Sequence, residues 1–152
     1  MHERDEAVAR LVAVEEIKQL KARYFRLMDT KDWKAMREVF TDDARMDIDG
    51  YVTDGGDAII AFMSGVLAQV RTVHHGHMPE ITVAGPDRAT GIWAMYDYVE
   101  FPGDAAAPQG LKGYGHYHEE YRIQDGAWRI ASTRLGRLRV DPLPGGLPQT
   151  PA

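Results

Sequence analysis

The chain contains no cysteine among its 152 residues, which excludes disulfide bonds, thiolate nucleophiles and cysteine-ligated zinc or iron–sulfur centres. It also lacks any run approaching the roughly 18 uninterrupted apolar residues that a membrane-spanning helix needs. The N-terminal stretch Met1-His2-Glu3-Arg4-Asp5-Glu6 is charged and has no apolar segment typical of a signal peptide. These absences predict a soluble, cytoplasmic protein with no membrane partner.

Basic residues are outnumbered, with 18 Lys and Arg against 23 Asp and Glu and a formal net charge of −5. A nucleic-acid surface normally requires a basic face, so no nucleic-acid partner is expected. The apolar content of 44% is ordinary for a globular protein, and the length favours one domain. We assign that domain to residues 1–141 and interpret residues 142–152, rich in Pro and Gly, as a C-terminal tail.

The N-terminal part of the chain has helical periodicity. Apolar residues recur at helical spacing from about Asp5 to Met28, and Asp32 is placed to cap a second, short helix. Phe40–Ala44 is interpreted as a turn that leads into a short strand, and a third helix is expected over about residues 57–70.

The remainder of the chain has the residue composition of β-strands. Beyond Arg71 the sequence is rich in Val, Ile, Thr, Trp and Tyr, and Asp125-Gly126 marks a hairpin turn. Residues 102–110, rich in Pro, Gly and Ala, are expected to form a loop. Helices followed by an antiparallel meander predict an α+β fold class.

Five of the six histidines fall in two clusters, Val73-His74-His75-Gly76-His77 and Gly115-His116-Tyr117-His118. Both clusters lie in predicted strands. Side chains alternate along a strand, so His74 is expected on the opposite face from His75 and His77, while His116 and His118 share a face. Because an imidazole can accept and return a proton near neutral pH, the clusters suggest a shared pocket with acid–base chemistry.

A metal site is the main chemical alternative for the second cluster. His116-x-His118 followed by Glu119 and Glu120 is similar to the His-x-His and glutamate ligands of cupin barrels. The spacing is wrong, however, because the cupin glutamate would fall four or five residues after His118, where this chain has no carboxylate. We therefore predict no metal and no cofactor.

Several stretches carry a family resemblance. The first is Ile17-Lys18-x-Leu20-Lys21-x-x-Tyr24-Phe25-Arg26-x-x-Asp29-x-x-Asp32-Trp33. The others are Val73-His74-x-Gly76-His77-x-Pro79-Glu80-Ile81 and Tyr121-Arg122-x-x-Asp125-Gly126-x-Trp128-Arg129-Ile130. In this order and spacing they resemble the SnoaL-like, NTF2-like superfamily over roughly residues 8–140, and above all dehydratases of the bile acid 7α-dehydratase and scytalone dehydratase type. The resemblance implies a cone, in which a curved antiparallel sheet and N-terminal helices enclose a pocket.

The resemblance also implies site residues. It identifies Tyr24, Asp29 and His74 as catalytic and Arg137 as substrate-binding. The strand pattern adds further substrate-binding candidates: His118, Tyr51, Trp93 and Tyr117. Tyr51 is included because the position of a second pocket tyrosine in these dehydratases aligns near Ile48, only three residues away. Purely structural roles remain open for four of them: Tyr24 as a core tyrosine, Asp29 as a carboxylate at a helix end, Arg137 as a surface arginine and His118 as a solvated or subunit-contact residue.

The predicted chemistry needs only these side chains. A carboxylate that accepts a hydrogen bond from one imidazole nitrogen holds the ring neutral, in one tautomer, so the other nitrogen can act as a base. A phenol can donate to a carbonyl or leaving oxygen as negative charge develops. We therefore predict a cofactor-free dehydratase-type lyase that acts on a hydrophobic hydroxy compound, steroid-like, polycyclic or aromatic. The alternatives are an isomerase or cyclase of the same fold, or a non-catalytic ligand-binding protein. A homo-oligomer, trimer or dimer, is expected.

Overall fold

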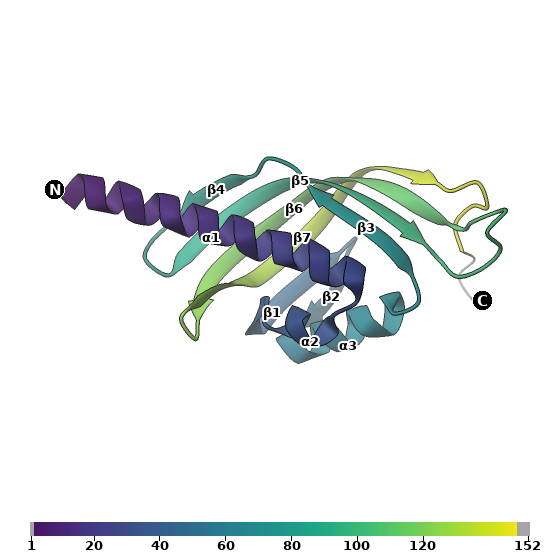
Figure 1. Ribbon diagram of the computed structural model, residues 1–152, viewed down its shortest axis with the longest axis horizontal. Helices are drawn as coiled ribbons and strands as arrows, with labels where there is room; N and C mark the ends of the chain where they lie inside the picture. Colours follow the sequence, from purple (N-terminus) through teal and green to yellow (C-terminus); the bar gives the residue numbers. More distant parts are fainter. Residues whose placement is uncertain (1, 149–152) are drawn as a thin grey trace.

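The computed structural model describes residues 2–148 (Figure 1). Three helices are present, α1 (His2–Thr30), α2 (Trp33–Arg37) and α3 (Gly56–Leu67). The seven strands are β1 (Phe40–Ile48), β2 (Tyr51–Asp54), β3 (Arg71–Gly76), β4 (Glu80–Val83), β5 (Arg88–Glu100), β6 (Gly110–Gln124) and β7 (Ala127–Pro142). The α+β class predicted from the sequence is confirmed.

Helix α1 lies across the concave side of a curved sheet, and its N-terminal turns project beyond the sheet (Figure 1). Its buried residues follow the predicted helical stripe: Ala13, Ile17, Leu20, Lys21, Tyr24, Leu27 and Met28. The chain leaves the helix through Lys31, whose φ of 62° reverses its direction. Asp32 then caps α2 by accepting a hydrogen bond from the Ala35 N–H at 3.1 Å, which confirms the capping prediction.

The sheet has the strand order β2-β1-β7-β6-β5-β3, with β4 also paired to β5. All pairs are antiparallel except β1–β7, which is parallel and opens with Phe40 beside Ile130. The prediction of a turn at Phe40–Ala44 is wrong, because these residues begin β1. Phe40 and Ala44 are completely buried, so pairing and core packing override the turn tendency of the two aspartates between them.

Strict alternation along β5 and β6 determines which side chains reach the interior. Odd-numbered residues from Ala89 to Asp97 and from Gly113 to Tyr121 are buried, while their even-numbered neighbours are more exposed. The hairpin between β6 and β7 turns at Asp125 and Gly126, both with positive φ (52° and 78°), as the Asp-Gly signal predicted. The concave face therefore presents one defined set of side chains toward the helices.

The segment after β7 contacts the body of the protein over the residues described. Leu143 is 6% exposed, and its N–H donates to the Gly110 carbonyl at 2.9 Å. Gly110 in turn donates to Gly146 at 2.9 Å. Residues 149–152 of the expected tail lie outside the described residues. Between residues 2 and 148, no helix combines the length and apolar character needed to cross a lipid bilayer.

Candidate active site

A cavity of about 270 Å³ lies between α1, α3 and the concave face of the sheet. Its wall is mainly apolar, and its volume lies slightly below the range of about 300–1,000 Å³ found for ligand pockets. The apolar lining comprises Met28, Met46, Ile48, Phe62, Met63, Val66, Leu67, Val99, Phe101, Leu111 and Leu135. The polar lining is a smaller set: Tyr24, Thr72, His74, Asp97, Tyr117 and Arg137.

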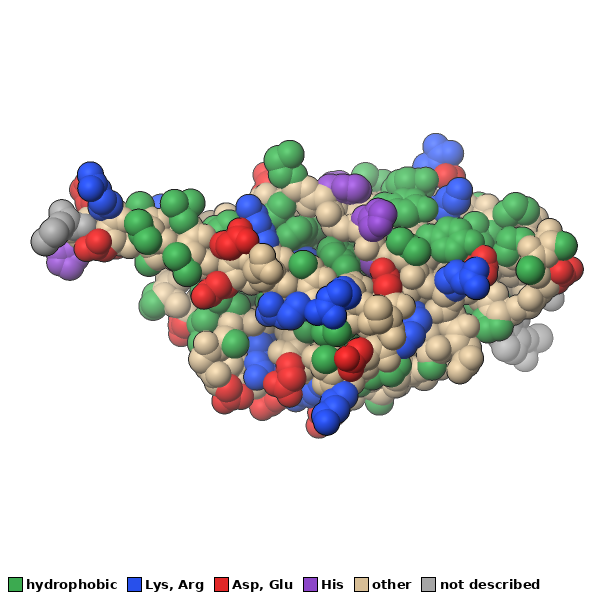
Figure 2. Space-filling view, in the orientation of Figure 1, with side chains coloured by type: hydrophobic (Ala, Val, Ile, Leu, Met, Phe, Trp, Pro, Cys, Tyr) green, Lys and Arg blue, Asp and Glu red, His purple; other side chains and the backbone are tan. Residues whose placement is uncertain are grey.

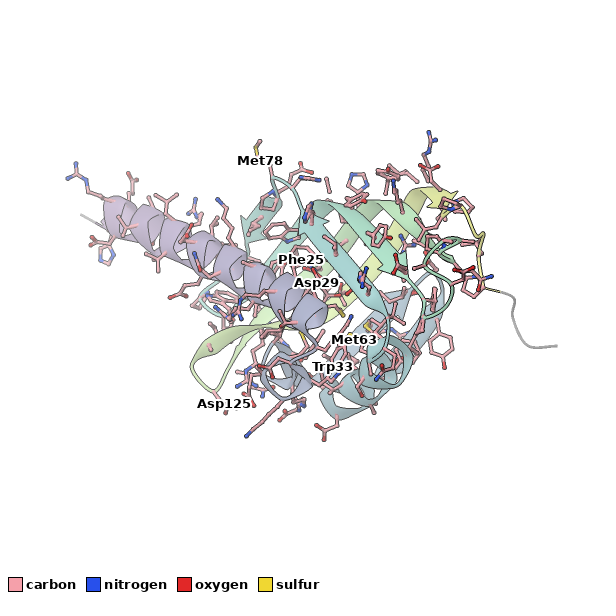
Figure 3. All side chains as sticks on the ribbon, turned by 45° about the vertical axis from the view of Figure 1, so that its right-hand side comes forward. Phe25, Asp29, Trp33, Met63, Met78 and Asp125 are labelled. Carbon is pink, nitrogen blue, oxygen red and sulfur yellow. The ribbon has the colours of Figure 1, made fainter. Side chains whose placement is uncertain are left out.

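Asp29 and His74 form a hydrogen-bonded pair at this cavity. Asp29 lies in the last turn of α1, one turn beyond Phe25 (Figure 3), and His74 lies on β3. The His74 Nδ1 atom is 2.7 Å from Asp29 Oδ1, and the His74 backbone N–H donates to Asp29 Oδ2 at 2.8 Å. One carboxylate therefore holds both the ring and the backbone of the same histidine.

The carboxyl group of Asp29 is held in its ionised form. Burial alone would raise its pKa, but hydrogen bonds from the His74 ring and backbone and from the Thr72 hydroxyl outweigh burial and lower the pKa below 3.8. An ionised Asp29 can only accept, so the His74 Nδ1 carries the proton. The Nε2 atom is then the free, basic nitrogen of a ring that lines the cavity.

Neighbouring residues fix this pair in place. The Thr72 hydroxyl donates to Asp29 Oδ1 at 2.9 Å, and the Lys31 ammonium donates to the same hydroxyl at 2.8 Å. The ring of Phe25 stacks over His74 with an interplanar angle of 17°. These contacts restrict the imidazole to one orientation.

Two phenols, Tyr24 on α1 and Tyr117 on β6, share one wall of the cavity, and both are 2% exposed. Burial raises the pKa of both phenols, and the charge of Glu119 raises them further, so both keep their protons at neutral pH. They are therefore suited to donate hydrogen bonds to an oxygen in the cavity rather than to act as bases.

A completely buried lysine lies behind the two phenols. The Lys21 ammonium is 3.8 Å from the ring centroid of Tyr24 and 3.7 Å from that of Tyr117. It also donates to Glu119 Oε2 at 2.8 Å. Glu119 accepts further hydrogen bonds from Thr133 (2.6 Å) and Tyr121 (2.8 Å). Glu119 thus accepts three hydrogen bonds, which link α1 to β6 and β7 beneath the cavity wall.

A second charge pair, Asp97 with Arg137, also lines the cavity. Asp97 is the register partner of His74 on β3 and of Gly113 on β6. Two nitrogens of Arg137 donate to the two oxygens of Asp97 at 2.8 and 2.9 Å, and a third donates to Asp49 at 3.1 Å. Three of the five guanidinium N–H groups are used in this way, which leaves two for a ligand.

Gly113 makes room for this pair. A Cβ atom at residue 113 would overlap both Arg137 Nη1 and Asp97 Oδ1, because the glycine lies between the strands that carry them. We expect Gly113→Ala to displace the ion pair, to lower the free energy of unfolding by about 1–3 kcal/mol and to weaken ligand binding. Thermal unfolding checks the first effect. Gly136→Ala on β7, whose added Cβ meets nothing closer than 3.9 Å, is the matched control. Equal stability of the two variants would contradict the packing argument.

Three residues predicted to bind substrate are not among the residues that line this cavity. His118 is exposed on the outer face of β6, because it directly follows the inward-facing Tyr117. Trp93 is buried in the core, where its indole N–H donates to the Tyr121 hydroxyl at 2.8 Å. Tyr51 is 61% exposed and stacks on Phe62, so it contacts a lining residue from outside.

Four of the predicted residues line this cavity, namely Tyr24, His74, Tyr117 and Arg137, and Asp29 is hydrogen-bonded to the ring of His74. His75 is exposed on the opposite face of β3 from His74, as parity predicted, and His77 is exposed just beyond the strand. The possible metal ligands of the second cluster separate as well. Glu119 faces inward while His116, His118 and Glu120 face outward, and within residues 2–148 no three His, Asp or Glu side chains are grouped as a metal site.

Asp97, Lys21 and Glu119 were not predicted from the sequence. The sequence pattern could have identified Asp97, because it is the one acidic residue among the alternating inward-facing residues of β5, which include Trp93 and Met95. No sequence pattern indicated that Lys21 would be buried. A lysine beside an apolar helical stripe usually marks the solvent boundary, and only the fold places Glu119 opposite it.

Comparisons with known proteins agree with this architecture. The structure of a hexachlorocyclohexane dehydrochlorinase (LinA type 2) superposes with a TM-score of 0.80 at 20% identity, covering 95% of this chain and 98% of that one. A putative scytalone dehydratase from Novosphingobium aromaticivorans gives 0.80 at 18% identity, covering 89% and 90%. A cystatin-like, NTF2-like protein from the same species has a TM-score of 0.68 at 25% identity, over 88% and 87%. The fold is therefore that of the NTF2-like class.

Sequence comparison defines the family. The model of the SnoaL-like domain matches residues 9–134, so the chain belongs to the SnoaL-like family. The structure of Rv3472, a protein of unknown function from Mycobacterium tuberculosis, is 32% identical with a TM-score of 0.74, covering 86% of this chain and 74% of that one. A curated relative, the probable cyclase FGR4 of Gibberella zeae, is 26% identical over 134 residues, which is 80% of this chain and 89% of that protein. Proteins similar to this chain therefore include a probable cyclase in sequence, and a dehydrochlorinase and a putative dehydratase in fold.

Proposed function

We propose that the protein is a cofactor-free acid–base enzyme that removes a proton from carbon in a hydrophobic hydroxy compound and eliminates water. The observation that carries this proposal is the Asp29–His74 pair, joined at 2.7 Å at the wall of an apolar cavity. A protein that only binds apolar ligands has no need of an oriented imidazole beside an ionised carboxylate.

The roles follow from the geometry. His74 Nε2 takes the proton from the carbon next to an activating carbonyl, and the electron pair of that C–H bond forms the new double bond. The carbon–oxygen bond at the β position breaks, and the imidazolium returns the proton so that the hydroxyl leaves as water. Asp29 stabilises the imidazolium in between.

Other residues of the cavity wall can stabilise the negative charge that develops on a substrate oxygen. The Tyr24 and Tyr117 phenols hold their protons, and Arg137 has two N–H groups not used by Asp97 or Asp49. Any of these donors can stabilise an enolate oxygen without a change in its own protonation. The cavity of about 270 Å³ favours a compact aromatic or fused-ring substrate over an extended one.

Cyclisation is the second candidate, because the chain is 26% identical over 134 residues to a probable cyclase. Both reactions begin with the same proton abstraction. The deciding experiment incubates the enzyme with a panel of cyclic β-hydroxy ketones and aromatic polyketide-like ketones, and follows enone absorbance and product mass. Loss of 18 Da identifies dehydration, whereas an unchanged mass with a new ring identifies isomerisation or cyclisation. Binding of the panel without any turnover would leave a ligand-binding protein as the conclusion and contradict the proposal.

A further inference from the structure

The first three turns of α1 are largely uncovered by the rest of the described chain, although Glu6, Ala9 and Arg10 share a surface hollow with residues 83–86. Every side chain from His2 to Val12 is exposed, and the helix projects past the sheet (Figure 1). Burial begins only at Ala13. Figure 2 shows apolar side chains along this segment, interspersed with charged ones.

The apolar residues of the segment form one stripe. Val8, Leu11 and Val12 are 54%, 69% and 50% exposed, and their spacing of three and four places them on one face of the helix. At about 100° per residue, this face points roughly 150° away from the stripe that begins at Ala13 and continues into the core. The exposed stripe is therefore a separate surface rather than a frayed edge of the core.

Charged residues extend the stripe at both ends. Arg4 lies four positions before Val8, and Glu15 lies four positions after Leu11, so all four share one line along the helix. The line reads basic, apolar, apolar, acidic. Glu15 bonds only to the neighbouring Gln19 amide at 3.0 Å, within the same exposed surface.

We propose that this surface, the Arg4–Glu15 stripe, binds the same stripe of a second copy of the chain in an antiparallel helix pair. With the two-fold axis between residues 9 and 10, Val8 of each helix contacts Leu11 of the other. Arg4 of each then lies opposite Glu15 of the other, so the two ends of the seam are complementary in charge. A parallel pair would instead place Arg4 beside Arg4 and Glu15 beside Glu15.

The geometry permits this arrangement. The body of each subunit lies on the side of α1 that carries its core stripe, so the two bodies end up at opposite ends and on opposite sides of the helix pair (Figure 1). The seam covers residues 4–15, or about 18 Å of helix. An interface of this size is expected to give a weak dimer whose population depends on concentration.

The test is a charge exchange followed by sedimentation velocity at about 5 to 500 µM protein. We expect a reversible dimer for the unaltered chain and a Kd weakened at least about tenfold by either Arg4→Glu or Glu15→Arg, since each change places like charges opposite one another twice. The double variant carrying both changes restores the dimer. Arg10→Glu, on the opposite side of the helix, is the matched control and leaves the Kd unchanged.

Cysteine cross-linking tests the direction of the pair, because the chain has no cysteine of its own. Val8→Cys protein mixed with Leu11→Cys protein is expected to form a disulfide-linked dimer at least about tenfold faster than Val8→Cys alone. Faster cross-linking of Val8→Cys alone would indicate a parallel pair, and equal rates would indicate no defined direction; either result overturns the proposal. A chain that stays monomeric at the highest concentration, or a dimer indifferent to both charge changes, overturns it as well.

Discussion

Replacing Lys21 by methionine is expected to lower the free energy of unfolding by about 3–5 kcal/mol, although the substitution adds an apolar side chain to a core. The ammonium and Glu119 are both fully buried and 2.8 Å apart, so removal of the lysine leaves an unpaired carboxylate in the interior. For a chain of this size the loss corresponds to a fall of roughly 10 °C in Tm, measurable by calorimetry. Lys18→Met, on an exposed position of the same helix, provides the matched control and is expected to change Tm by less than about 2 °C.

A second variant shows whether the effect comes from charge. In Lys21→Met/Glu119→Gln neither charge remains, and the glutamine can still bond to Thr133 and Tyr121. This double variant is expected to recover most of the lost stability. If it is as unstable as Lys21→Met, the packing of the lysine stem, and not its charge, holds this region together.

Loss of the imidazole at residue 74 is expected to lower kcat/KM by about 10³–10⁴-fold with any substrate that the panel identifies. His74→Ala removes the base, whereas Asp29→Asn keeps the shape but allows the wrong tautomer, so a decrease of similar size is expected for both. Thr72→Val, which removes one of the bonds to Asp29, is the milder comparison and should cost about tenfold. The measurement is steady-state kinetics with Tm recorded for every variant.

The non-additivity of the pair separates a shared role from two independent ones. If Asp29 acts only through His74, His74→Ala/Asp29→Asn is no slower than His74→Ala alone. Activity that survives both single changes would show that the proton acceptor lies elsewhere in the cavity. Ligand binding that is retained in the inactive variants would show that the cavity itself is intact.

The sequence was sufficient to predict the elements that depend on a regular apolar period or on local capping and turn residues. The stripe along α1, the Asp32 cap and the Asp125-Gly126 turn depend on local chemistry and appear where they were predicted. The start of β1 at Phe40 was missed because it depends on a strand some ninety residues later, beside Ile130, and local residues favoured a turn. Pairing between strands that are distant in the chain cannot be predicted from a short window of sequence.

In the candidate site, too, some residues could be judged from the local sequence and others only from the assembled fold. Parity alone could have rejected one prediction, since Tyr117 and His118 are adjacent and cannot both face the cavity from a regular strand. The exclusion of Trp93 is different. Trp93 faces inward as expected, but it lies in the core near Phe25, where its indole N–H donates to Tyr121, and it is not among the residues that line the cavity. Which inward-facing residues of a strand reach the cavity depends on the assembled sheet and has no local signature.

The bond between the His74 backbone and Asp29 has a consequence beyond orientation of the imidazole. β3 is the last strand in the order of the sheet, so one of its sides has no neighbouring strand to pair with. Unpaired amides on such an edge invite another extended chain to add to the sheet. By accepting the His74 N–H at 2.8 Å, the Asp29 carboxylate occupies a donor in the middle of this edge. Asp29, the residue proposed to orient the base, thus also makes this sheet edge less available for pairing with another chain. Selection against aggregation and selection for chemistry would then act on the same side chain.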